Sequence, residues 1–311
     1  MASFEPVSYR ARVTPKVPWT PIDVMQIMFA WFIALFIGQT AYGLLIPPRV
    51  QGTHEIMDGN QSMSVEFLSE NRYQADGHEG TYSFAGKPPA QNRNTIILKP
   101  DSGESIRTRF AGTSRDRMGL LAVNMLFIQG TAILLTLLLL RKYKLRWREA
   151  FGGFRPPDKV FALPILLGIL FLVPAFALHF VAQYLIQQFG GTHEAQQAVT
   201  MVAQSENTAE VAIQALSIII LAPLAEELLF RGVIYTSIRE LGYRKVAIVV
   251  SSVIFAAIHG SWALMLPLTV LAMALIWLYE YTGSITAPII MHATFNAVNF
   301  TLIKLAPQMT Q

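Results

Sequence analysis

Two adjacent carboxylates and an arginine interrupt an apolar stretch of the chain, in the segment Leu-Ala-Pro-Leu-Ala-Glu-Glu-Leu-Leu-Phe-Arg-Gly that ends at Gly232. Ionisable side chains in such stretches are costly and therefore point to function. In a helix, Glu227 stands four residues before Arg231, the favourable order for an ion pair, whereas Glu226 lies about 100° further round. We predict that Arg231 neutralises Glu227 and leaves Glu226 free as a general base. Alternatively, the three residues mark a helix end, where charged side chains reach water.

Two further apolar segments each carry a histidine, in Phe-Ala-Ala-Ile-His259 and in His292-Ala-Thr-Phe-Asn296. His292 and Asn296 are four residues apart and share one helix face, so they can donate two hydrogen bonds to one oxygen, as an oxyanion hole requires. Taken alone, His259 also fits a structural histidine bonded to a neighbouring carbonyl. A glutamate base, a histidine and this donor pair suffice for attack of water on a peptide carbonyl. The predicted catalytic residues are Glu226, His259, His292 and Asn296, with Glu227 and Arg231 as supporting residues.

Other hydrolytic chemistries fit the sequence less well. The chain has no cysteine, which excludes thiol catalysis and cysteine-based zinc sites. It contains no His-Glu-x-x-His motif. Ser261 lies in Gly260-Ser261-Trp262, which no glycine follows, so the glycine pattern expected around a catalytic serine is missing. A glutamate-dependent hydrolase is therefore the favoured hypothesis.

The composition places these residues in a membrane protein. Of 311 residues, 53% are hydrophobic and 14% are charged, against about a quarter charged in soluble domains. The net charge of +4 comes from lysines and arginines that flank the apolar stretches, as expected for the orientation of membrane helices. We therefore expect the lipid bilayer as a partner and no nucleic acid.

The apolar stretches predict an all-α, polytopic transmembrane bundle of about seven spans. No helix breaker follows Gly232, so the fourth helix is expected to continue to Leu241, giving about 46 Å from residue 211. The predicted spans are residues 24–46, 119–140, 160–186, 211–230, 246–258, 263–279 and 284–303.

The distribution of basic residues predicts the topology. Five lysines and arginines follow the second span within residues 141–148, whereas residues 187–210 contain none, so the first group is assigned to the cytoplasm. The N-terminus is then expected in the cytoplasm. The expected membrane is the plasma membrane of a bacterium or, in a eukaryote, the endoplasmic reticulum membrane. The predicted parts are a cytoplasmic segment 1–21, a first transmembrane helix 22–47, an extracytoplasmic insertion 48–118, a second helix with a basic loop 119–159, and a catalytic membrane core 160–305.

The polar insertion 48–118 contains short alternating segments, including residues 64–68 and 95–98, which are typical of β-strands. It is expected to form either a small β-rich cap or a partly disordered loop.

Over residues 160–303 the sequence resembles the CPBP family, which comprises the CAAX proteases and bacteriocin-processing enzymes, is also called the Abi family, and includes the Ras-converting CAAX endopeptidase. The resemblance rests on three ordered motifs, Glu226-Glu227-x-x-x-Arg231, Phe255-x-x-x-His259 and His292-x-x-x-Asn296. It implies a helical intramembrane hydrolase whose site opens toward the cytoplasm. It also implies Glu226 as base aided by His259, and His292 with Asn296 stabilising the oxyanion. The insertion has no counterpart in the usual core, which leaves substrate and partners open.

The resemblance also raises the question of a metal, because the family was long described as metalloproteases. Glu226, His259 and His292 could supply three zinc ligands with one open position. Asparagine is an unusual zinc ligand and a good oxyanion donor, so we favour catalysis without a cofactor and keep zinc as the alternative.

The expected function is hydrolysis of a protein or peptide substrate at the membrane, associated with lipid or prenylated in the CAAX manner. Two other classes remain open. One is a non-catalytic scaffold or immunity protein of the same fold. The other is a transporter that uses the buried Glu and His residues to relay protons or cations, although the two halves of the chain show no inverted repeat.

Overall fold

The computed structural model describes residues 15–45, 50, 52–58, 61–75, 78–85, 92–109, 114–153, 158–189, 199, 202–203, 205 and 207–306. Most of the predicted N-terminal segment, residues 1–14, lies outside the described residues, and so do residues 190–198 of the loop that lacks basic residues. The chain divides into two compact units. One contains Met1–Trp31, Gln129–Gln196 and Ala215–Gln311, and the other contains Phe32–Ile128 and Gln197–Gln214. The predicted five-part division stays a prediction.

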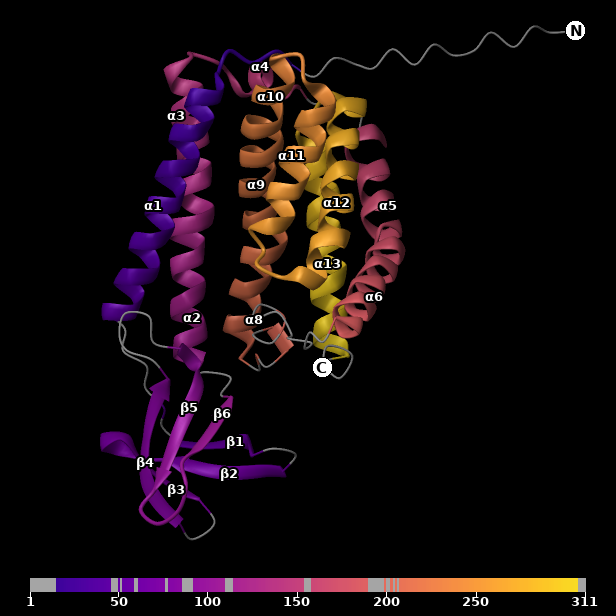
Figure 1. Ribbon diagram of the computed structural model, residues 1–311. Helices are drawn as coiled ribbons and strands as arrows, with labels where there is room; N and C mark the ends of the chain where they lie inside the picture. Colours follow the sequence, from indigo (N-terminus) through magenta and orange to yellow (C-terminus); the bar gives the residue numbers. More distant parts are fainter. Residues whose placement is uncertain are drawn as a thin grey trace, which may run out of the picture. The chain divides into compact units, whose positions relative to one another are not determined.

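The first unit is a bundle of helices (Figure 1). Its longest helix runs without a break from Thr208 to Glu240 over 33 residues, with its first turns in the second unit. This confirms that the helix carrying the two glutamates continues well past Gly232. Along it, α-helical and π-helical turns alternate as α8 (Thr208–Ala215), η4 (Leu216–Leu221), α9 (Ala222–Glu227), η5 (Leu228–Tyr235) and α10 (Thr236–Glu240).

The remaining helices follow the chain in order. They are α1 (Pro21–Leu45), α2 (Ser114–Val123), the π-helix η2 (Asn124–Gly130), α3 (Thr131–Lys142), α4 (Trp147–Phe151), the π-helix η3 (Asp158–Ala162), α5 (Leu163–Leu170), α6 (Leu172–Gln188), α11 (Arg244–Ala257), α12 (Trp262–Thr282) and α13 (Thr286–Leu305).

In the described part of the chain, five helices are long and apolar enough to cross a membrane, against about seven spans predicted from the sequence. α11 has 14 residues and reaches about 21 Å, short of a hydrocarbon core of about 30 Å. α13 is 20 residues long, but its polar residues, including His292 and Asn296, lower its hydropathy. The five helices are Pro21–Leu44, Met118–Lys142, Val160–Gln188, Thr208–Glu240 and Trp262–Thr282.

Close packing fixes α13 within the bundle. α12 and α13 share a core of apolar side chains made by Leu271, Leu275, Leu278, Ala287 and Met291. On the other side, α13 contacts α5, where Gly168 faces it so closely that an added Cβ would lie 2.7 Å from the carbonyl oxygen of Met291. The backbone just before His292 is therefore held from two directions.

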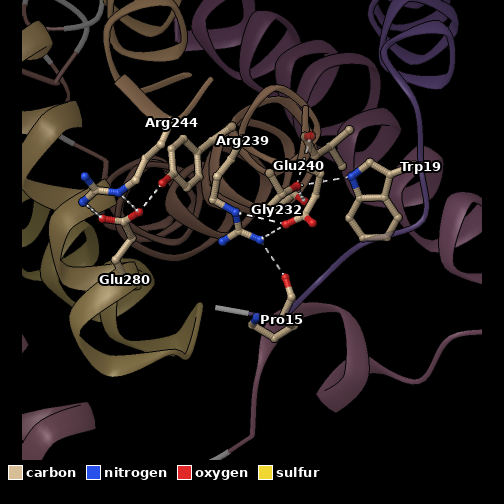
Figure 2. Close-up of polar contacts among 10 residues, drawn as sticks. Pro15, Trp19, Gly232, Arg239, Glu240, Arg244 and Glu280 are labelled. Carbon is tan, nitrogen blue, oxygen red and sulfur yellow. Dashed lines mark hydrogen bonds and ion pairs between the residues drawn. The ribbon is translucent and has the colours of Figure 1, made fainter. Parts of the chain in front are cut away.

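A polar network ties the end of the long helix to α11 and α12 (Figure 2). The Tyr235 hydroxyl donates to the Glu280 carboxylate on α12. Arg244, at the start of α11, binds the same carboxylate with Nε 2.8 Å from Oε1, and this bond raises the pKa of Arg244. One carboxylate thus joins three helical segments.

The residues before α1 lie against the same end of the long helix (Figure 2). Trp19 is 2% exposed, its Nε1 donates to Thr236 Oγ1 at 3.2 Å, and its ring lies 6.2 Å from that of Phe151. Arg239 donates to the carbonyl oxygen of Pro15 at 2.8 Å. The described part of the N-terminal segment is therefore packed into the helical unit.

The second unit contains a six-stranded antiparallel sheet in which neighbouring strands follow the chain order (Figure 1). Its apolar side chains form a core of their own, which includes Val65, Phe67, Tyr73, Ile96 and Leu98. The strand hypothesis for residues 64–68 and 95–98 is confirmed, apart from Leu68, and the loop alternative is wrong for the described residues. The strands are β1 (Gly52–Asp58), β2 (Gln61–Phe67), β3 (Arg72–Ala75), β4 (His78–Ala85), β5 (Asn92–Pro100) and β6 (Ile106–Arg109).

Candidate active site

The ion pair expected between Glu227 and Arg231 is present in the long helix. Arg231 Nη1 lies 2.9 Å from Glu227 Oε1, and the two side chains are 1% and 0% exposed. A second bond runs from Arg231 Nη2 to the carbonyl oxygen of Ala272 on α12 at 3.3 Å. The buried charges are thus paired with each other, and the arginine is also anchored to a second helix.

His292 extends this pair toward Glu226. Its Nδ1 lies 3.0 Å from Glu227 Oε1, and because an ionised carboxylate can only accept, Nδ1 is the donor. Its Nε2 then points to the other glutamate, 3.7 Å from Glu226 Oε2. The Glu226 side chain is 25% exposed, so a continuous line of polar groups runs from buried Arg231 to a partly exposed carboxylate.

Sequence reasoning missed the contact between Glu227 and His292. From the sequence, we predicted that Glu227 pairs with Arg231 alone and that His259 assists Glu226. Among the described residues, the recorded ionic contact of Glu226 is with His292, 3.7 Å away, rather than with His259. The only signal in the sequence for the contact between Glu227 and His292 is the second acid of the motif. One carboxylate is enough to neutralise Arg231, so the other is available for a different contact.

His259 is half-buried near the end of α11, and its Nδ1 lies 2.7 Å from the carbonyl oxygen of Phe255. This is the bond expected of a structural histidine. It is also compatible with catalysis, because a carbonyl only accepts, so Nδ1 carries the hydrogen and Nε2 stays available as an acceptor. The bond therefore fixes the tautomer of His259.

Asn296 and His292 turn toward the same helix, as their spacing of four residues predicts. Asn296 Nδ2 donates to the carbonyl oxygen of Ile218 in η4 at 2.9 Å, about two turns before the two glutamates that His292 contacts. The amide nitrogen has a second hydrogen, which can serve another acceptor. Asn299, in contrast, donates to Phe295 of its own helix at 3.0 Å.

Residues 208–298 match the family described as type II CAAX prenyl endopeptidase Rce1-like. The segment is an Rce1-like domain. All six residues predicted for the site lie within it. The resemblance inferred from the three motifs is confirmed, and with five membrane-spanning helices the chain is an integral membrane protein with a mostly helical fold.

Two curated proteins resemble parts of the chain. UPF0177 protein YxdF of Lactococcus lactis subsp. lactis (strain IL1403) is 40% identical over 88 residues, which are 28% of this chain and 48% of that protein. Uncharacterized protein YpbD of Bacillus subtilis (strain 168) is 35% identical over 83 residues, 25% of this chain and 40% of that protein. The chain thus matches about half or less of the length of these relatives, and no solved structure gives a significant match.

Zinc stays the alternative to catalysis without a cofactor. No group of three His, Asp or Glu side chains is arranged to hold a metal ion among the described residues. Within the predicted set, Nδ1 of His292 is bound to Glu227 at 3.0 Å and Nδ1 of His259 to a carbonyl at 2.7 Å, so Nε2 is the nitrogen left on each ring for a proton or a metal ion.

Proposed function

We propose that the Rce1-like domain is an intramembrane endopeptidase in which Glu226 activates the attacking water. One observation carries this proposal. Arg231, Glu227 and His292 form a buried line with contacts of 2.9 and 3.0 Å, and Glu226, 25% exposed, stands at its end 3.7 Å from His292. Such a line leaves one carboxylate accessible while its neighbour is neutralised.

Glu226 would take a proton from water as the water oxygen attacks the carbonyl carbon of the peptide bond. It would then deliver that proton to the amide nitrogen as the carbon–nitrogen bond breaks, which yields a carboxylic acid and an amine. His259 can support the first step, since its Nε2 is the acceptor nitrogen when Nδ1 binds the carbonyl oxygen of Phe255. No redox partner or cofactor is needed to balance these steps.

His292 and Asn296 would stabilise the oxyanion. Because His292 Nδ1 already donates to Glu227 at 3.0 Å, its Nε2 can donate only in the imidazolium form. Asn296 has one amide hydrogen left beside its bond to Ile218. The loss of one such donor costs about a hundredfold to a thousandfold in kcat.

The proposed substrates are membrane-associated proteins or peptides, including prenylated ones with CAAX-like C-termini. The name of the matching family, a prenyl endopeptidase, supports this class. The basic residues 141–148 support a cytoplasmic N-terminus, in a bacterial plasma membrane or in the endoplasmic reticulum membrane of a eukaryote. A site that opens toward the cytoplasm would meet such C-termini.

The test is peptidase activity of the purified chain in proteoliposomes. A farnesylated peptide ending in a CAAX sequence and its unprenylated twin serve as substrates. We expect Glu226→Gln to lower cleavage at least a hundredfold, while Glu240→Gln, a carboxylate of the same helix that pairs with Arg239, leaves it unchanged. Equal cleavage by both variants would reject the role of Glu226.

Two further measurements separate the alternatives. Inhibition by 1,10-phenanthroline, reversed by added zinc, would favour the metallopeptidase. A wild-type chain that cleaves neither peptide but drives ion flux across the vesicle membrane would favour the transporter. If the chain is a scaffold or immunity protein, the wild type should cleave neither peptide, and Glu226→Gln should still bind the partner.

A further inference from the structure

One aromatic ring contacts three polar residues of the candidate site. Phe255, on α11, is 0% exposed. The Arg231 guanidinium carbon lies 4.7 Å from the centre of its ring, a cation–π distance. The ring of His259 is 5.0 Å away and tilted by 55°, and the ring of His292 is 5.9 Å away at 71°. Phe230 meets the ring edge-on at 5.1 Å and 89°.

Arg231 has two carboxylates within its electrostatic reach. It interacts with both Glu227 and Glu226, yet its recorded ion pair is with Glu227 alone. The Nε atom of Arg231 has no hydrogen-bond partner among the described residues. The guanidinium is thus held by Nη1 on Glu227, by Nη2 on Ala272 and by the face of Phe255.

The Phe255 ring and the two glutamate carboxylates all attract the guanidinium of Arg231. If the guanidinium moved toward Glu226, it would neutralise the carboxylate that the proposed mechanism needs as a base. The stacking on Phe255 opposes this movement because a buried cation loses its π contact when it leaves the ring. The same ring contacts both imidazoles, so it also limits how they can rotate.

We propose that Phe255 is a positioning residue that keeps Arg231 on Glu227 and away from Glu226, and that holds the rings of His259 and His292 in place. Its catalytic consequence rests on the proposed function. The placement of Arg231 does not, so the two can be tested separately.

The first experiment needs no activity. The full-length chain in detergent is treated with a water-soluble carbodiimide and glycine ethyl ester, and the label on Glu226 and on Glu227 is measured by tandem mass spectrometry. In Phe255→Leu we expect the ratio of label on Glu226 to label on Glu227 to fall severalfold, because Arg231 shifts to Glu226. Phe230→Leu is the matched control: Phe230 is also buried, and it touches the same ring. A ratio that is the same in both variants would overturn the proposal.

The second experiment measures cleavage. Misplacement of catalytic groups by about 1 Å costs about a hundredfold in rate, so Phe255→Leu should lower kcat by about that factor with KM within about twofold. Phe255→Tyr keeps the ring face and should recover most of kcat, whereas Phe230→Leu should change thermal stability more than kcat.

The two outcomes are distinguishable. If the wild-type chain cleaves no substrate but the labelling ratio falls in Phe255→Leu, the proposed function fails and the positioning role stands. If cleavage is present and Phe255→Leu and Phe230→Leu lower kcat equally, or Phe255→Tyr restores nothing, the ring acts only as packing and the positioning proposal is wrong.

Discussion

The ion pair between Arg231 and Glu227 should be far more costly to break than to remove entirely. Both side chains are at most 1% exposed, so Arg231→Met leaves a carboxylate without its counter-ion in the interior. Breaking a buried pair in this way costs about 3–5 kcal/mol. The loss of the bond to Ala272 at 3.3 Å adds about 1 kcal/mol. For a chain of this size class, each kcal/mol lowers Tm by about 2–4 °C.

The double variant Arg231→Met with Glu227→Gln removes both charges and keeps an acceptor for His292. One buried amide group then lacks a partner, which costs about 1–3 kcal/mol. We therefore expect the double variant to be more stable than Arg231→Met alone by about 2 kcal/mol. Such a difference is a direct measure of coupling between the two residues.

The assay is unfolding in mixed lipid and detergent micelles, followed by fluorescence against temperature and against denaturing detergent. Arg244→Met is the matched control, because the Arg244 side chain is 56% exposed and Glu280 keeps its bond from Tyr235, so the loss of this pair should cost only about 1 kcal/mol. The reasoning is refuted if Arg231→Met costs no more than Arg244→Met. It is also refuted if the two substitutions at the buried pair simply add.

Two further predictions concern packing and pH. Gly168→Ala puts a Cβ 2.7 Å from the carbonyl oxygen of Met291, so we expect α13 to shift and cleavage to fall, while Gly153→Ala, with no atom within 4 Å, stays neutral; activity and Tm of both variants check this. In the sheet, burial raises the pKa of Tyr82, whose hydroxyl donates to Val50 O at 3.1 Å. The contribution of Tyr82 to stability should therefore be fully present below the pKa of an unfolded tyrosine, about 10. It should be lost as the pH rises through the higher pKa that Tyr82 has in the folded protein. In pH-dependent unfolding of the sheet, Tyr82→Phe should lower stability at pH 7 by about 1 kcal/mol and weaken the alkaline loss.

Sequence periodicity predicted what depends on local helix geometry. The pairing of Glu227 with Arg231 follows from their spacing of four residues, and the continuation of the helix follows from the absence of a breaker after Gly232. The shared face of His292 and Asn296 follows from the same rule, since both side chains bond to the long helix. Each of these features involves residues within one turn or one helix.

The contacts between helices could not be predicted in the same way. The bond from His292 to Glu227 joins residues 65 positions apart, and the bond from Asn296 to Ile218 joins residues 78 apart. The π-helical segments η4 and η5 lie on both sides of the glutamates. Bonding from residue i to i+5 widens each turn there, so a face extrapolated with 3.6 residues per turn drifts away from the true one. The span count differs for a simpler reason, because α11 has only 14 residues and the polar residues of α13 lower its hydropathy.

In the proposed mechanism, the charges along the polar line give each of the two acids a separate role. Arg231 and Glu227 cancel each other, so the bound His292 would be unsupported as an imidazolium if Glu227 were the only carboxylate. With Glu226 ionised, 3.7 Å from His292 Nε2, the protonated form of His292 gives the four groups a net charge of zero. In the proposed mechanism Glu226 accepts a proton from water, and the four groups would then carry one positive charge beside the developing oxyanion. Under the proposed mechanism, the site would therefore be neutral before the attack of water and positive when negative charge forms on the substrate, which is the direction of change that favours hydrolysis.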